Sequence, residues 1–319
     1  LYPTGGILGA HLPALAGAII GGAAFGDFIA PISDTTIASA LSQKAKIGET
    51  VKSRIKYIVP AAIIALVGYT LTSTLFLSDA KASENILAGR PEGLLMLAVP
   101  ALIIFLFLKG KHLVHGLLFG LLFGTILGVF SGLLPLKQVI SLDLENFAAK
   151  SFIIDGINRA VGLSIFTMLL MGLVATLKAS GIMTKLIDYA SLHAKTKKDA
   201  EGWIASIMSV AVLLTTHSIV AILMVSDFSN KTGNKLGVSK IRRANLLSLA
   251  ACIFPFLLPY FIPVILMANM TKTGEEFGVS QVSPLDVGLY NFMSWGLLAV
   301  ALVTILFEFK KRKNIKNGK

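Results

Sequence analysis

Long apolar blocks alternate with short polar and charged stretches over the whole chain. An α-helix needs about 20 predominantly apolar residues to cross a bilayer, and most of these blocks approach or reach that length. The pattern therefore predicts an all-α, polytopic membrane protein. The apolar blocks fall at 5–25, 57–78, 93–108, 113–134, 161–178, 202–226, 246–270 and 287–307.

The composition also favours a membrane protein and argues against other classes. Of the 319 residues, 55% are hydrophobic and only 14% are charged, whereas soluble domains carry about a quarter charged residues. The formal net charge of +12 comes from short Lys and Arg runs between apolar blocks. Such runs are typical of cytoplasmic loops, so no nucleic-acid partner is expected.

The sequence lacks the motifs of common enzymes and cofactor sites. Its single cysteine, Cys252, excludes an internal disulfide, and no Cys/His cluster offers a zinc or haem site. No G-x-x-x-x-G-K-S/T phosphate loop occurs, which argues against ATP-driven pumping. We therefore expect a protein that is not an enzyme and has no cofactor. Because Leu1 opens the chain inside an apolar segment, we also expect upstream sequence to be absent.

Positive charge gives the expected orientation in the membrane. The basic stretches 44–56, 179–200, 227–245 and 308–319 should all be cytoplasmic, and the last of these places the C-terminus there. A single crossing by 202–226 would put its two basic flanks on opposite sides. The conflict disappears if 202–226 is a re-entrant hairpin that enters and leaves on the same side.

The middle of this hairpin has the polar composition of a tip. It separates two half-length apolar runs, Trp203–Leu214 and Ile219–Val225. We expect the tip to close the ion site as a gate. Its residues are Thr215, Thr216, His217 and Ser218.

Prolines predict two broken helices. Pro31 interrupts the helical pattern of 5–43, and Pro255 and Pro259 interrupt that of 246–270. Proline lacks the N–H that would continue a helix, so the helix should break at each of these places. The expected orientation gives the two broken helices opposite directions, as in transporters built from inverted repeats.

The broken helices divide the chain into two expected parts. Residues 1–78 hold the end of a first repeat, made of the broken helix 5–43 and the span 57–78. Residues 79–319 hold a second repeat. Its parts are the spans 93–108, 113–134 and 161–178, the hairpin 202–226, the broken helix 246–270, the span 287–307 and a basic tail at 308–319.

Two carboxylates and three hydroxyls surround the first expected break. They belong to Asp27, Ser33, Asp34, Thr35 and Thr36. A charge at bilayer depth is costly unless it is paired, hydrated or bound to a cation, so the acids predict a functional site. Carboxylate and hydroxyl oxygens suit a hard cation. Competition of Na⁺ and H⁺ for one carboxylate is the simplest exchange chemistry of such a site.

Structural roles for the same residues stay open. Asp34 or Ser33 can cap the helix that starts at Thr35, and Asp27 can be a structural acid that faces a loop. The hydroxyls can serve helix start and packing. The positive end of the helix dipole at Thr35 would attract an anion rather than a cation, which leaves an anionic substrate open.

A longer stretch around these residues resembles the signature of a transporter family. Phe25-Gly26-Asp27, followed by Pro31-Ile32-Ser33-Asp34-Thr35-Thr36, is similar to G-A-x-F-G-D-x-x-S-P-L-S-D-T-T of the NhaC family of Na⁺/H⁺ antiporters. The chain departs from that signature at Ala30 and Ile32, and the first change removes one oxygen ligand. Block 246–270 keeps the prolines of the family's second broken helix but not its acid, Ser and Asn.

The resemblance implies a multi-pass secondary transporter of the ion-transporter superfamily in the cytoplasmic membrane. Na⁺/H⁺ antiport is the leading hypothesis: Asp27 and Asp34 bind Na⁺ and H⁺ alternately, and cytoplasmic Na⁺ leaves as external H⁺ enters. Ser33, Thr35 and Thr36 assist. A Na⁺- or H⁺-coupled carrier of a malate- or lactate-type carboxylate or an amino acid is the alternative. A non-transporting membrane scaffold is a third hypothesis, and formation of a homodimer is left open.

Overall fold

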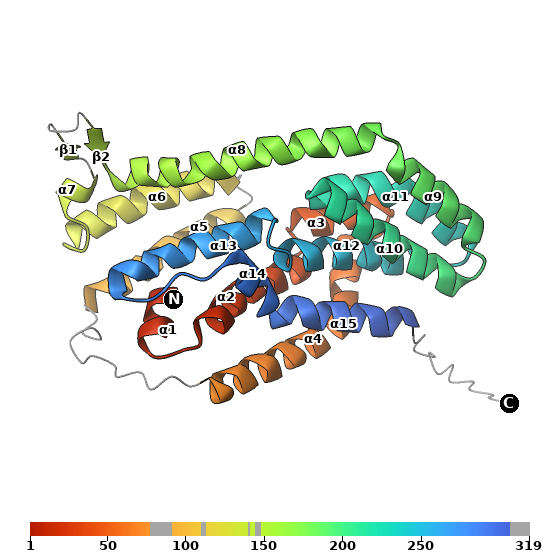
Figure 1. Ribbon diagram of the computed structural model, residues 1–319, viewed down its shortest axis with the longest axis horizontal. Helices are drawn as coiled ribbons and strands as arrows, with labels where there is room; N and C mark the ends of the chain where they lie inside the picture. Colours follow the sequence, from red (N-terminus) through yellow and green to blue (C-terminus); the bar gives the residue numbers. More distant parts are fainter. Residues whose placement is uncertain (77–90, 110–112, 140, 144–147, 307–319) are drawn as a thin grey trace. The chain divides into compact units, whose positions relative to one another are not determined.

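A computed structural model describes residues 1–76, 91–109, 113–139, 141–143 and 148–306 (Figure 1). The predicted all-helical class is confirmed, apart from one pair of three-residue strands. The chain forms two compact units, one made of Leu1–Lys81 with Leu169–Lys319 and the other of Ala82–Met168. The predicted basic tail at 308–319 lies outside the described residues.

The first unit contains most of the helices. They are α1 (Tyr2–Ile7), α2 (Leu12–Ile29), α3 (Asp34–Ser42), α4 (Ile47–Leu75), α9 (Ile182–His193), α10 (Lys197–Thr215), α11 (Ser218–Lys235), α12 (Lys240–Ile253), η2 (Phe254–Phe256), α13 (Ile262–Thr271), η3 (Lys272–Phe277), α14 (Pro284–Leu289) and α15 (Phe292–Leu306).

The second unit is smaller. It contains η1 (Pro91–Leu97), α5 (Ala98–Leu108), α6 (Leu113–Phe130), α7 (Leu136–Val139) and the antiparallel strands β1 (Ser141–Asp143) and β2 (Ala148–Lys150). α5 and α6 pack on each other. α8 (Phe152–Ala179) begins in this unit and ends in the first.

The first broken helix is formed by α2 and α3. α2 ends at Ile29, Ala30 is extended with φ −69° and ψ 126°, and α3 begins at Asp34. The ring of Pro31 disfavours helical backbone at the residue before it, which is Ala30. The last backbone carbonyls of α2 are therefore released at the break.

The second broken helix is formed by α12, η2 and α13. Pro255 stands inside the 3₁₀ turn η2, and Pro259 lies in the non-helical stretch before α13. A third proline, Pro263, is near the first residue of α13, where its missing N–H is not needed. The prolines thus end one helix and start the next.

A third interruption was not predicted. The apolar block 287–307 is split between α14 and α15, which are separated by Tyr290 and Asn291. The buried Asn291 side chain donates to the Phe256 carbonyl at 2.7 Å and to the Ser294 hydroxyl at 3.0 Å. The side chain therefore satisfies a carbonyl that the second broken helix releases, and an amide inside an apolar block is the only sequence signal for this turn.

α10 and α11 pack against each other as a helical hairpin. Thr216 takes the left-handed conformation at φ 52° and, with His217, separates the two helices. The two predicted apolar runs cover only part of each helix, because α10 has 19 residues and α11 has 18. The capping box of Thr196 and Asp199 starts α10 in polar sequence, so the helix is longer than its apolar run.

Other helices also continue into polar sequence. α4 begins at Ile47 rather than at 57, and α8 begins at Phe152 rather than at 161, whereas α6 ends at Phe130 rather than at 134. A predicted span marks only the apolar part of a helix, so the amphipathic ends are missed.

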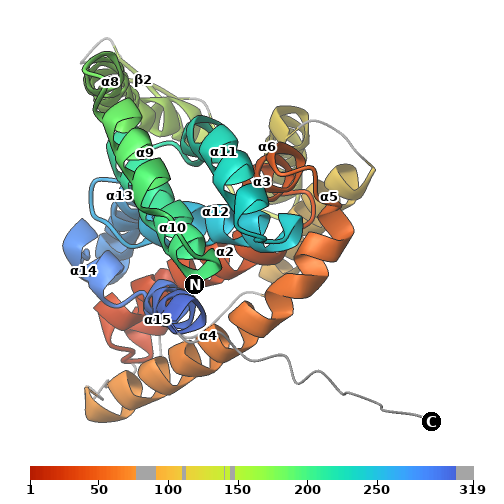
Figure 2. The same ribbon diagram turned by 90° about the vertical axis from the view of Figure 1, so that its right-hand side faces the viewer.

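Two helical stretches of the described residues are long and apolar enough to cross a membrane. They are Leu12–Ser42, with 31 residues across α2 and α3, and Ile47–Leu75, with 29 residues. α4 packs along α15, and α2 lies against both (Figure 2). Gly296 of α15 allows this close approach, because a Cβ there would lie 2.7 Å from the Ala61 carbonyl of α4.

Candidate functional site

Both oxygens of the Asp27 carboxylate accept hydrogen bonds across the broken helices. Asp27 lies in the last turn of α2. The Ser33 hydroxyl, from the break that follows, donates to Oδ1 at 2.6 Å. The Cys252 thiol, from the last turn of α12, donates to Oδ2 at 3.2 Å. The carboxylate is therefore held where the first broken helix meets the second.

Thr35 completes this arrangement. Its hydroxyl lies 2.8 Å from the Ser33 hydroxyl and 3.6 Å from the Cys252 sulfur, and its side chain is buried. We call Asp27, Ser33, Thr35 and Cys252 the carboxylate cluster. Three of these residues were predicted as ion ligands. Cys252 was not, because an isolated cysteine in an apolar block resembles a core residue.

Asp34 lies outside the carboxylate cluster. It is exposed, and its Oδ1 accepts the backbone N–H of Thr35 at 2.7 Å, in the first turn of α3. A carboxylate there also interacts favourably with the positive end of the helix dipole. This geometry supports the helix-start role for Asp34 that the sequence left open, and no hydrogen bond among the described residues joins it to Asp27.

Thr36 faces away from the cluster, toward a buried arginine. The Arg54 guanidinium of α4 donates to the Thr36 hydroxyl and to the Phe28 carbonyl, each at 2.6 Å. It also donates to the Ser39 hydroxyl at 3.2 Å and to the Asn245 amide oxygen at 3.3 Å. Arg54 has no exposed surface and lies over the Phe28 ring, 4.9 Å from its centroid.

Arg54 lies in the core rather than in the predicted cytoplasmic stretch. It was counted with the basic loop 44–56, but α4 begins at Ile47 and carries Arg54 into the core. The helical spacing contained a signal, since Arg54 precedes the buried Tyr57, Ile58 and Ala61 by three, four and seven residues. Residues at this spacing share one face of a helix.

The basic stretch 227–245 is also largely helical rather than a loop. α11 runs to Lys235, α12 begins at Lys240, and Arg243 is buried. Arg243 donates to the Gln43 side chain at 3.0 Å and to the Val238 carbonyl at 2.6 Å. An arginine side chain is long and carries five N–H donors, so it can be buried where several oxygens converge.

One residue of the hairpin tip forms a hydrogen bond to α12, beside the carboxylate cluster. The Ser218 hydroxyl donates to the Ala251 carbonyl at 2.9 Å, next in sequence to Cys252. Thr215 and Thr216 make hydrogen bonds within the tip, and His217 is exposed. Ser218 is thus a residue of the predicted gate that bonds the second broken helix.

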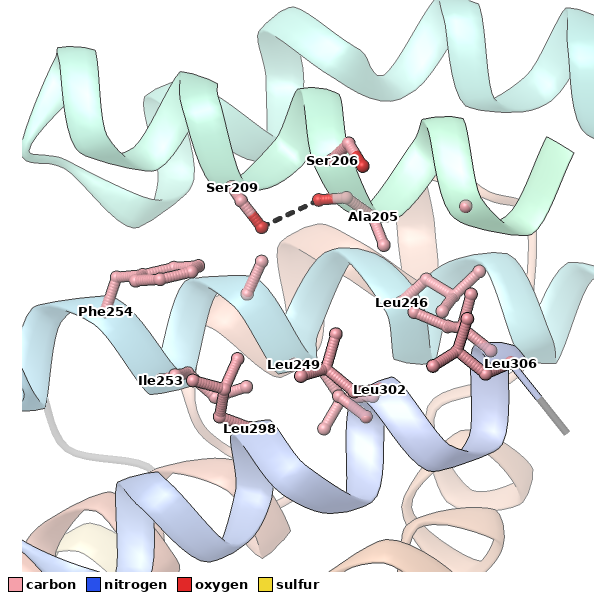
Figure 3. A pocket seen from close by; sticks show the side chains of 14 residues that line it. Ala205, Ser206, Ser209, Leu246, Leu249, Ile253, Phe254, Leu298, Leu302 and Leu306 are labelled. Atoms are coloured by element: carbon pink, nitrogen blue, oxygen red, sulfur yellow. Dashed lines mark hydrogen bonds between the residues drawn. The ribbon is translucent and has the colours of Figure 1, made fainter. Parts of the chain in front are cut away.

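A separate cavity of about 320 Å³ lies among α10, α12 and α15 (Figure 3). Its lining is apolar except for Ser206 and Ser209, and the Ser209 hydroxyl donates to the Ala205 carbonyl at 2.8 Å. The cavity includes no residue of the carboxylate cluster. It therefore offers no carboxylate to a cation.

Comparisons with known proteins add nothing to this picture: no protein-family model, curated protein or solved structure matches the chain. Over the part of the chain that the structure describes, no three His, Cys, Asp or Glu side chains gather as a transition-metal site would require. The chemistry of the site consequently rests on the carboxylate cluster and its hydroxyls.

Proposed function

We propose that this protein is a multi-pass secondary transporter of the cytoplasmic membrane that exchanges Na⁺ for H⁺ at Asp27, as a member of the NhaC family that its signature resembles. The observation that carries the proposal is the Asp27 carboxylate, held between two broken helices by Ser33 and Cys252. Na⁺ and H⁺ can compete for a carboxylate in that position.

The carboxylate cluster can bind either Na⁺ or H⁺ without a rearrangement of its backbone. Ser33 and Thr35 hydroxyls are at once donors and acceptors. When Asp27 is free, Ser33 donates to it at 2.6 Å. When Na⁺ binds, the hydroxyl hydrogens turn away and the oxygen lone pairs of Ser33 and Thr35 face the ion. Proton binding to the carboxylate removes the charge that attracts Na⁺, so the two ions exclude each other.

The order of elements supports an inverted-repeat transporter. A broken helix followed by an apolar helix occurs twice, first as α2 and α3 before the 29-residue α4, and then as α12 and α13 before α14 and the 15-residue α15. α4 packs on α15, and α2 packs on α12. In the proposed topology the C-terminus is cytoplasmic, the α10–α11 hairpin is re-entrant, and Ser218 closes the site against α12.

The contacts of Arg54 favour a cation over an anionic solute. A carboxylate substrate would need free N–H donors near the break. The donors of Arg54 already bind Phe28, Thr36, Ser39 and Asn245. The carboxylate cluster instead offers oxygens, which repel an anion and attract a cation.

Everted membrane vesicles with a respiration-driven ΔpH test the proposal. Addition of Na⁺ should collapse the ΔpH in the wild type, and Asp27→Asn should abolish the collapse because the amide carries no exchangeable charge. Asp34→Asn is the matched control and should retain exchange, since Asp34 is exposed and bonds only the start of α3. Full Na⁺-dependent collapse in the Asp27→Asn vesicles would end the proposal.

A further inference from the structure

Oxygen atoms surround the buried guanidinium of Arg54. They are the Phe28 carbonyl, the Thr36 and Ser39 hydroxyls and the Asn245 amide oxygen, at 2.6, 2.6, 3.2 and 3.3 Å from its nitrogens. Carbonyl, hydroxyl and amide oxygens are the hard ligands that proteins offer to alkali and alkaline-earth cations. We call these four residues the oxygen cage.

The oxygen cage belongs to the break itself. Phe28 lies in the last turn of α2, where backbone carbonyls lack partners within the helix and carry the negative end of its dipole. Thr36 and Ser39 come from α3, and Asn245 comes from α12. The cage therefore joins both broken helices around one positive charge.

No carboxylate neutralises that charge at close range. Arg54 makes no ion pair within 4.0 Å with a described Asp or Glu, whereas Arg242 pairs with Glu201 at 2.7 Å. Asp27 interacts with Arg54 over a longer distance. An arginine stays protonated under all physiological conditions, so its charge is permanent.

We propose that Arg54 is the resident cation of this site: its guanidinium fills an oxygen cage that would otherwise bind a second transported cation. The inference rests on the proposed cation site at Asp27 and adds that this site exchanges one monovalent cation at a time. A second mobile cation would have to displace a charge that is covalently attached to α4. Arg54 is thus a positioning residue that also limits the number of exchanged ions.

Chemical rescue tests the inference. Arg54→Ala empties the oxygen cage, and the free guanidinium ion restores its charge and shape. Urea is planar and of similar size but uncharged. In the purified full chain, millimolar guanidinium should raise the melting temperature of Arg54→Ala toward that of the wild type, whereas urea should not. Without guanidinium, equilibrium ²²Na⁺ binding should show one more Na⁺ per chain than in the wild type.

Arg243→Ala is the matched control, because it removes a buried guanidinium that also bonds only uncharged oxygens, but none of them belongs to the break between α2 and α3. These oxygens come from Gln43, Asn234, Val238 and Asn230. Its Na⁺ stoichiometry should equal that of the wild type. Equal effects of guanidinium and urea on Arg54→Ala, or an unchanged Na⁺ stoichiometry, would overturn the inference. If the wild type binds no Na⁺, the proposed exchange fails, while the guanidinium and urea comparison still decides on Arg54.

A second pair of variants applies if Arg54→Ala does not fold. Arg54→Lys keeps the charge and Arg54→Gln keeps much of the size. The inference requires the Lys variant to retain a higher melting temperature and more exchange than the Gln variant. A Gln variant that equals or exceeds the Lys variant would show that the oxygen cage needs only a neutral donor.

Discussion

Replacement of Gly17 by alanine tests the packing that holds the Asp27-bearing helix. Gly17 lies in the middle of α2, where the Tyr290 carbonyl of the α14–α15 turn approaches so closely that an added Cβ would overlap it. The Tyr69 hydroxyl donates to the Gly17 carbonyl at 2.9 Å. A backbone carbonyl cannot rotate out of the way as a flexible side chain can, so α2 or the α14–α15 turn would have to shift.

Gly22, in the same helix, provides the matched control. No atom would lie within 4 Å of a Cβ at Gly22. Alanine is more favourable than glycine inside a helix by about 1 kcal/mol, and this gain applies to both positions. Overpacking costs about 1–3 kcal/mol, and at a rigid backbone we take the upper half of that range. Gly22→Ala should therefore be neutral or stabilising by up to about 1 kcal/mol, and Gly17→Ala should be destabilising by roughly 1–2 kcal/mol.

Thermal melting of the detergent-solubilised protein, followed by the loss of monodisperse protein on size exclusion, measures this difference. The wild type should melt at a higher temperature than Gly17→Ala and at the same or a lower temperature than Gly22→Ala. A Gly17→Ala protein that melts together with Gly22→Ala would refute the close approach of α2 to Tyr290. It would also remove the argument that this contact positions the last turn of α2.

Two further predictions concern the carboxylate cluster and the start of α10. Cys252→Ser keeps a donor to Asp27 and adds an oxygen that can ligate Na⁺. This oxygen should strengthen Na⁺ binding by about 1 kcal/mol and lower the Na⁺ KM roughly fivefold. An unchanged or higher KM in ²²Na⁺ uptake would contradict this prediction. The Thr196 backbone N–H, 2.9 Å from Asp199, holds the pKa of that carboxyl below its usual range. The capping box should therefore persist above the unfolded-state pKa and loosen as the pH falls through the lowered folded-state pKa. Hydrogen exchange at the start of α10, corrected for intrinsic rates, should show this loss, and Asp199→Asn should lack the pH dependence.

Helix interruptions were predictable wherever a local residue causes them. Pro31, Pro255 and Pro259 fall in or beside non-helical or 3₁₀ backbone, because the ring acts on its own and the preceding residue. Pro60, however, lies inside the continuous helix α4, so a proline favours a break without requiring one. The turn at Tyr290–Asn291 carries no proline. It depends on Asn291 bonding the Phe256 carbonyl, a contact between residues 35 positions apart that no local pattern reveals.

The candidate site was predictable as a set of residue types but not as a set of contacts. Asp27, Ser33 and Thr35 are close in sequence, so a single break suffices to gather them. Cys252 is 225 positions away from Asp27 and joins them only because α12 packs against α2 and α3. Asp34, one residue from Ser33, turns outward because it starts a new helix.

By itself, the sequence determined the helical class, the apolar character and the prolines that end helices, since these depend on composition and on local backbone chemistry. Only the tertiary structure decided that Arg54 is buried, that Cys252 faces Asp27 and that Asp34 does not. Those outcomes depend on which helix faces meet. A basic residue near a helix end is exposed to water unless distant segments bring oxygen atoms together around it. Here α2, α3 and α12 bring such oxygens to Arg54.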